Sequence, residues 1–192
     1  MTVPLASLPL VPASTPSGLS QARAERFERI VSDHFSGMWR FLRRLGLSEA
    51  DTDDAAQEVL LVVVAKLDAI HPKSERSFLF STAFRMAARV RRGRKHQDID
   101  EVAAEDADAD PEQLLELKRA RAMLDRLLSP MPIDLRAVFV LYELEGMTMA
   151  EIASTLELAP GTVASRLRRG RDFFNARFEK AKAQKQAIGA EP

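Results

Sequence analysis

A cluster of arginines near the C-terminal end of the chain has the residue types and spacing needed to contact nucleic acid. The segment "APGTVASRLRRGRDFF" (159–174) contains Arg166, Arg168, Arg169 and Arg171. Arginine suits this chemistry because its planar guanidinium can pair with guanine edges and with phosphates. At 100° per residue, Thr162, Ser165 and Arg169 share one helix face, and Arg166 and Arg168 flank that face.

The opposite face of the same helix is apolar, and a second short helix is expected just before it. The apolar face carries Val163, Leu167, Gly170 and Phe174, and Pro160 suits a first helical turn. Thr148 can cap the preceding short helix. A pair of helices with these faces is typical of a helix-turn-helix, whose second helix enters the major groove. The alternative is an ordinary helical hairpin with a solvated basic face.

One residue of this motif does not suit the turn. Glu157 stands at the turn position that glycine often fills. A left-handed backbone at a residue other than glycine costs about 1 kcal/mol. The turn is therefore expected to be strained.

A second group of polar side chains lies in "DDAAQEV" (53–59). Asp54, Gln57 and Glu58 fall on one helix flank at spacings of three and four. Paired carboxylates occur in acid–base and metal sites, but no histidine or third carboxylate converges on them from a second motif. The pattern therefore favours an exposed patch that docks a protein partner, and predicts no catalytic residue.

A third group mixes aromatic and basic residues. Its members run from Phe78, Phe80 and Ser81 through Arg85 to Arg89 and Arg92. Single-stranded nucleic acid binds to this combination, because bases stack on rings while cations follow the backbone. The competing interpretation is that the phenylalanines of this segment are core residues, which we favour for Phe84.

Composition excludes several classes of site. The chain has no cysteine, so it has neither disulfides nor a thiol nucleophile. His34, His71 and His96 are far apart, and we predict no metal site and no cofactor. The N-terminal residues have no basic residue before Arg23, and no apolar run approaches the length of about 20 residues that spans a bilayer. We therefore expect a cytoplasmic protein that does not insert into membranes and is not an enzyme.

The chain is expected to be all-α, with two small helical domains. Its net charge of zero hides a segregation: residues 85–95 contain six basic and no acidic residues, and residues 97–112 contain eight acidic and no basic ones. Such an acidic run suggests a tether. The predicted order is a disordered tail (1–20), a helical domain (21–96), an acidic flexible linker (97–112), a helix-turn-helix domain (113–180) and a flexible C-terminus (181–192).

Three stretches together resemble a known family. They are "FSGMWRFLRRLGLSEADTDDAAQEVLLVVVAKLDAI", "SFLFSTAFRMAARVRRGRK" and "RAVFVLYELEGMTMAEIASTLELAPGTVASRLRRGR". In this order they resemble the two regions of bacterial RNA polymerase sigma factors of the extracytoplasmic-function (ECF) group, over roughly residues 25–178. The resemblance implies a transcription initiation factor with three partners: core RNA polymerase, promoter DNA and an anti-sigma protein.

The resemblance also implies roles for the groups above. Asp54, Gln57 and Glu58 would lie at the surface that docks on the polymerase clamp. The third group would read the −10 element, with Phe78 where the family usually has tryptophan and Arg85 where it usually has asparagine. The helix-turn-helix would read the −35 element, with Thr162, Ser165, Arg166 and Arg169 facing bases and Arg168 and Arg171 nearer phosphates. The alternative is a free-standing helix-turn-helix regulator that needs no core enzyme.

Overall fold

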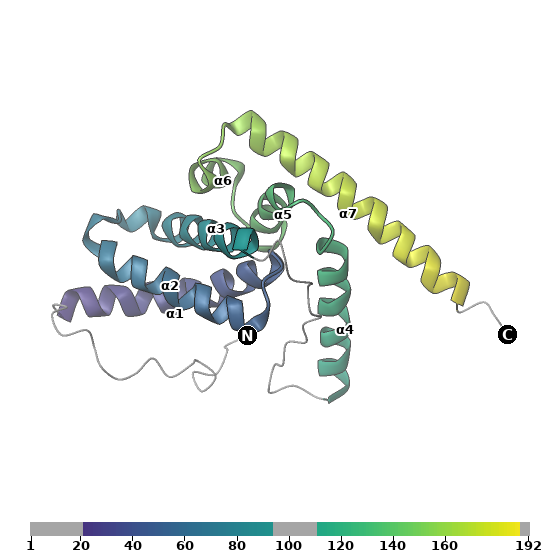
Figure 1. The fold of residues 1–192 in the computed structure, drawn as a ribbon, viewed down its shortest axis with the longest axis horizontal. Helices are drawn as coiled ribbons and strands as arrows, with labels where there is room; N and C mark the ends of the chain where they lie inside the picture. The colour runs from purple at the N-terminus through teal and green to yellow at the C-terminus, as the bar shows by residue number, and fades with distance from the viewer. Residues whose placement is uncertain (1–20, 94–110, 189–192) are drawn as a thin grey trace.

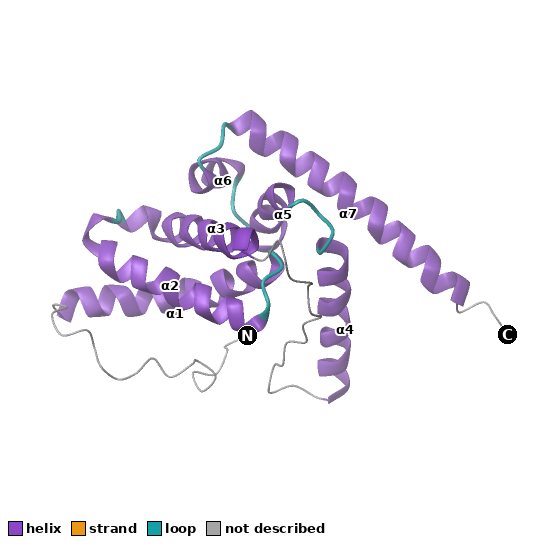
Figure 2. Ribbon diagram, in the orientation of Figure 1, coloured by secondary structure: helices purple, strands orange, loops and turns teal. Residues whose placement is uncertain are grey.

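The computed structural model describes residues 21–93 and 111–188, and every element within those ranges is helical (Figures 1 and 2). This confirms the predicted all-α class. The predicted tail (1–20) and most of the predicted linker lie outside the described residues. Within the two described ranges, no helix has both the length and the apolar character needed to cross a bilayer.

The first unit consists of three helices: α1 (Gln21–Arg44), α2 (Glu49–Lys66) and α3 (Glu75–Gly93). Two short 3-10 turns, η2 (Leu67–Ala69) and η3 (Pro72–Ser74), join α2 to α3. Ser48 caps α2 by accepting a hydrogen bond from the amide of Asp51. The rings of Phe41 and Phe80 meet edge to face in the core of this unit.

The second unit holds α4 (Pro111–Leu128), α5 (Ile133–Phe139), the π-helical turn η4 (Val140–Leu144), α6 (Met149–Leu156) and α7 (Pro160–Ile188). Thr148 caps α6 through a reciprocal capping box with Glu151. Helix α7 continues past residue 180, where the sequence analysis placed the end of the domain. It is the longest described helix and runs along one side of the second unit (Figure 1).

The turn between α6 and α7 has the strained conformation that the sequence suggested. Glu157 adopts the left-handed region, with φ 55° and ψ 46°, and its amide closes α6 by donating to the carbonyl of Ala153. Glu157 is the one residue other than glycine with a positive φ among the described residues. The strain is therefore a feature of this chain that some other contact has to offset.

The two units pack against each other. Helix α6 lies on α3 (Figure 1), and η4 contacts α1. Buried apolar residues of both units form one continuous core cluster. The sequence pattern predicts two domains but does not indicate this contact.

Replacing Thr148 with alanine tests the capping box. Thr148→Ala removes the hydroxyl that accepts from the Glu151 amide, and we expect it to lower the free energy of unfolding by about 1 kcal/mol. Thr148→Ser keeps the hydroxyl and is the matched control. The measurement is chemical denaturation of the full chain; equal stabilities for the two variants would contradict the role of the cap.

Candidate nucleic-acid interface

The buried side of α7 fixes which way its arginines face. Val163 and Leu167 are buried, and Phe174 stacks on Phe139 of α5 with ring centroids 5.1 Å apart. At Gly170 a Cβ atom would lie 3.3 Å from that of Phe139, so the glycine allows α5 and α7 to approach closely. This is the apolar face that the sequence predicts. Because it is held against α5, the opposite face of α7 must point away from the second unit.

The outward face of α7 carries the predicted reading residues. Ser165, Arg168 and Arg169 are exposed, and Thr162 is half-buried. Neither Arg168 nor Arg169 has a hydrogen-bond or ion-pair partner among the described residues. These guanidinium groups are therefore available to an external ligand.

The other two arginines of the cluster are held by acidic residues of the same unit. Arg166 Nε lies 3.5 Å from Asp134 Oδ2. Arg171 Nε donates to Glu143 Oε1 at 2.6 Å, and its guanidinium lies 5.0 Å from the centroid of the Tyr142 ring. Both ion pairs remain accessible to solvent, so phosphates could compete for them.

Helix α3 brings the aromatic and basic group together, but not with all side chains exposed. Phe80 is only 1% exposed and packs on Phe41, so it has no ring face left for a base. Phe78, Ser81 and Phe84 are half-buried, whereas Arg85, Arg89 and Arg92 are exposed. The expectation that Phe84 is a core residue agrees with its packing against the core cluster.

Two of the exposed arginines of α3 are already ion-paired. Arg85 Nη1 lies 3.2 Å from Glu157 Oε1, the carboxylate of the strained turn. Arg89 pairs with Glu58 of α2. The first of these pairs joins α3 to the helix-turn-helix, and the second joins α3 to the predicted docking patch.

The polar patch of α2 is exposed and extends further than the sequence analysis indicated. Asp54 and Gln57 are exposed, and Glu58 is half-buried beside Arg89. Leu61, on the same flank four residues after Gln57, is 69% exposed. Sequence reasoning did not single out Leu61. The sequence did contain a signal for an exposed apolar residue: the run "VLLVVV" has more apolar residues than one buried helix face can hold.

A second group that sequence reasoning missed lies between the two units. Glu145 follows η4, and its carboxylate reaches the first unit near Arg40, Arg44 and Arg76. Nothing in the sequence singles out this glutamate, because its partners are far away along the chain. Within the described ranges, no cluster of three or more histidine or acidic side chains could hold a metal ion.

Comparisons with known proteins agree with this geometry. The family described as "Sigma-70, region 4" matches residues 121–173. The ECF RNA polymerase sigma factor SigE of Mycolicibacterium smegmatis is 30% identical over 83% of this chain and 67% of its own length. The ECF RNA polymerase sigma factor SigL of Mycobacterium tuberculosis is 31% identical over 79% of this chain and 88% of its own length.

Two solved structures share the fold. CnrH in complex with the cytosolic domain of CnrY aligns with a TM-score of 0.63 at 24% identity, over 83% of this chain and 94% of that one. The sigma factor RpoE in complex with the anti-sigma factor NepR, from Bartonella quintana, aligns with a TM-score of 0.62 at 22% identity, over 80% and 96%. The sequence relatives therefore establish the family, and the structures show the same arrangement of helices. The chain belongs to the ECF group of RNA polymerase sigma factors.

Proposed function

We propose that this protein binds core RNA polymerase and directs it to promoters that it reads at two elements. The second unit reads the −35 element through α7, the first unit reads and opens the −10 element through α3, and α2 docks on the polymerase. The observation that carries this proposal is the face of α7, where exposed Ser165, Arg168 and Arg169 lie opposite a side fixed by Val163 and Leu167.

At the −35 element the residues of α7 divide into two roles. Thr162, Ser165 and Arg169, with Arg166 beside them, face base edges near the N-terminal end of the helix, the end that enters the major groove in this motif. Arg168 and Arg171 lie nearer the phosphates, where they neutralise charge and fix the register of the helix on DNA.

At the −10 element the exposed residues of α3 act on the single strand. Arg85, Arg89 and Arg92 follow the backbone, while Phe78 and Ser81 contact bases. Phe80 supports this surface from the core, because its ring is already packed on Phe41.

An anti-sigma protein is proposed to control the factor. Support comes from the fold: the RpoE structure that this chain resembles was solved with its anti-sigma factor. A protein that works with core polymerase and promoter DNA is active in the cytoplasm, which is where we place it. The proposal includes no cofactor and no catalysis by the chain itself.

Selection from a random promoter library with and without core RNA polymerase tests the function. We expect selective retention and strand opening only when core enzyme is present, at one fixed salt concentration because phosphate binding depends strongly on salt. Equal, sequence-specific retention without core would contradict the proposal and indicate a free-standing regulator.

Substitution on α7 tests the reading face. We expect Arg169→Ala to weaken promoter binding by the holoenzyme by about 1–3 kcal/mol and to relax base preference at one −35 position. Arg177→Ala, an exposed arginine two turns further along the same helix, is the control. The measurement is promoter binding over a set of −35 variants. Identical preferences for the two variants would contradict the role of Arg169.

Substitution on α2 tests core docking. We expect Leu61→Ala to weaken binding to core polymerase by about 1–2 kcal/mol, because an exposed apolar side chain beside Asp54 and Gln57 has the features of an interface contact. Stability should not change, since the side chain is exposed in the free protein. The measurement is competition with the wild type for limiting core, with Lys66→Ala of the same helix as the control; equal competition by both variants would rule out Leu61 as a contact.

A further inference from the structure

The junction between the two units contains a carboxylate held by arginines. Glu145 Oε1 lies 3.0 Å from Arg44 Nη1, and the Glu145 and Arg44 side chains are 6% and 19% exposed. Arg76 donates to the backbone carbonyl of Glu145. Arg40 and Arg76 also act on the carboxylate electrostatically. One acidic side chain of the second unit is thus embedded in a basic cluster that belongs to α1 and α3.

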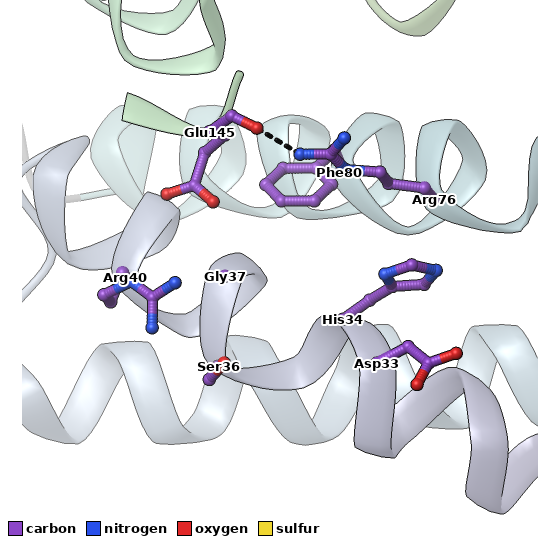
Figure 3. Close-up of a pocket in the computed structure, with 8 residues that line it drawn as sticks. All are labelled: Asp33, His34, Ser36, Gly37, Arg40, Arg76, Phe80 and Glu145. Atoms are coloured by element: carbon purple, nitrogen blue, oxygen red, sulfur yellow. Dashed lines mark hydrogen bonds between the residues drawn. The ribbon is translucent and has the colours of Figure 1, made fainter. Parts of the chain in front are cut away.

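A cavity adjoins this cluster and is open to a larger ligand. It has a volume of about 360 Å³, and its lining includes Arg40, Arg76 and Glu145 together with Asp33 and His34 (Figure 3). A water molecule occupies about 30 Å³ in the liquid, so the space exceeds what a single water needs. In Figure 3 the carboxylate of Glu145 points toward the side where Arg40 and Gly37 lie.

Gly37 makes room for this carboxylate. A Cβ atom at position 37 would lie 2.9 Å from Glu145 Oε2, closer than such contacts allow. Glycine inside a helix weakens it by roughly 0.5–1 kcal/mol relative to alanine, so its presence in α1 has a local cost. The oxygen that such a Cβ atom would meet is the end of a flexible side chain, so the short distance shows that α1 and Glu145 pack closely at this point.

Arginines that hold a carboxylate have the geometry to hold a phosphate, because guanidinium groups bind both anions through the same charged hydrogen bonds. We propose that Arg40, Arg44 and Arg76 form a binding site for backbone phosphates of single-stranded promoter DNA, and that Glu145 occupies this site when the two units are packed together. Packing of the units and DNA binding then compete. The inference rests on the proposed promoter function.

The charges at the site support this competition. The three arginines are opposed by Glu145 and by Asp33 at the cavity wall. Asp125 and Arg121 of α4 also act on Arg44. When Glu145 leaves, the cluster loses one opposing negative charge, which strengthens its attraction for a phosphate. Burial raises the pKa of Glu145, although the three arginines act in the opposite direction. Keeping the carboxylate ionised in the packed state therefore costs desolvation free energy.

The rest of the junction also separates α3 from nucleic acid. Helix α6 packs on α3, and the carboxylate of Glu157 forms an ion pair with Arg85. The names of the two proposed elements, −35 and −10, place them about 25 base pairs apart, or about 85 Å at 3.4 Å per base pair. Two units in direct contact cannot reach both elements, so promoter binding requires them to separate and exposes the arginine cluster.

Fluorescence energy transfer in the full chain measures the separation. The chain has no cysteine, so Lys66→Cys on α2 and Lys182→Cys on α7 can be labelled alone. We expect a single-stranded 20-mer of random sequence to lower the transfer efficiency of the wild-type protein at fixed salt, since a ligand that binds only the open state shifts the population toward it. Inorganic phosphate at the same phosphorus concentration should leave the efficiency unchanged.

Glu145→Gln should open the protein and tighten oligonucleotide binding. We expect a gain of about 5- to 150-fold, the usual range for coupling between two competing events. Adding Arg44→Gln to this variant should abolish most of the gain. Glu28→Gln, which removes an exposed charge from α1, is the control for net charge and should change neither readout.

Several results would overturn the inference. They are an unchanged transfer efficiency of the wild type with the oligonucleotide, opening by inorganic phosphate alone, and opening of Glu145→Gln without tighter DNA binding. The wild-type titration needs no substitution at the junction, so it remains decisive if Glu145→Gln fails to fold. Core-dependent transcription by the wild type, measured in parallel, shows separately whether the proposed function holds.

Discussion

A buried ion pair between Glu145 and Arg44 joins the two units at their junction. It joins residues 101 positions apart and sits where little solvent reaches. A buried ion pair stabilises only modestly, because removing both charges from water offsets most of the attraction. The packing of α6 on α3 and the contact of Glu157 with Arg85 accompany this pair. DNA phosphates can therefore compete only with the ionic part of this contact, because the apolar packing between the units does not depend on charge.

The second unit orients α7 through apolar packing rather than through charge. The side of α7 toward α5 is apolar, and the Phe139–Phe174 stack and Gly170 hold the helices in close contact. This packing does not depend on charge, so the arginines on the far side keep their orientation whether or not the units are in contact. Glu157 takes part in both the turn before α7 and the ionic contact between the two units. Its strained backbone costs about 1 kcal/mol, and its side chain gains an exposed, and therefore weak, pairing with Arg85.

The features that could be predicted from the sequence are those that depend on residues close together along the chain. The cap at Thr148, the strained turn at Glu157 and the apolar face of α7 each follow from residues a few positions apart. Sequence reasoning could not predict the junction, because Glu145 and Arg44 are ordinary surface residue types until the fold brings them together. Phe80 and Leu61 show the same limit: an aromatic residue expected to contact DNA lies in the core, and a leucine that the sequence did not single out is exposed. Periodicity tells how residues share a helix face but not what covers that face.

The most direct test of this account is the distance between the two units in the free protein and in the promoter complex. Spin labels on cysteines at positions 66 and 182 would report it by pulsed electron paramagnetic resonance, first in the free chain and then with core polymerase on promoter DNA. The account predicts one short distance in the free chain and an increase of tens of ångströms in the complex, since the two elements lie about 85 Å apart along the duplex. The same distance distribution in both states would contradict it.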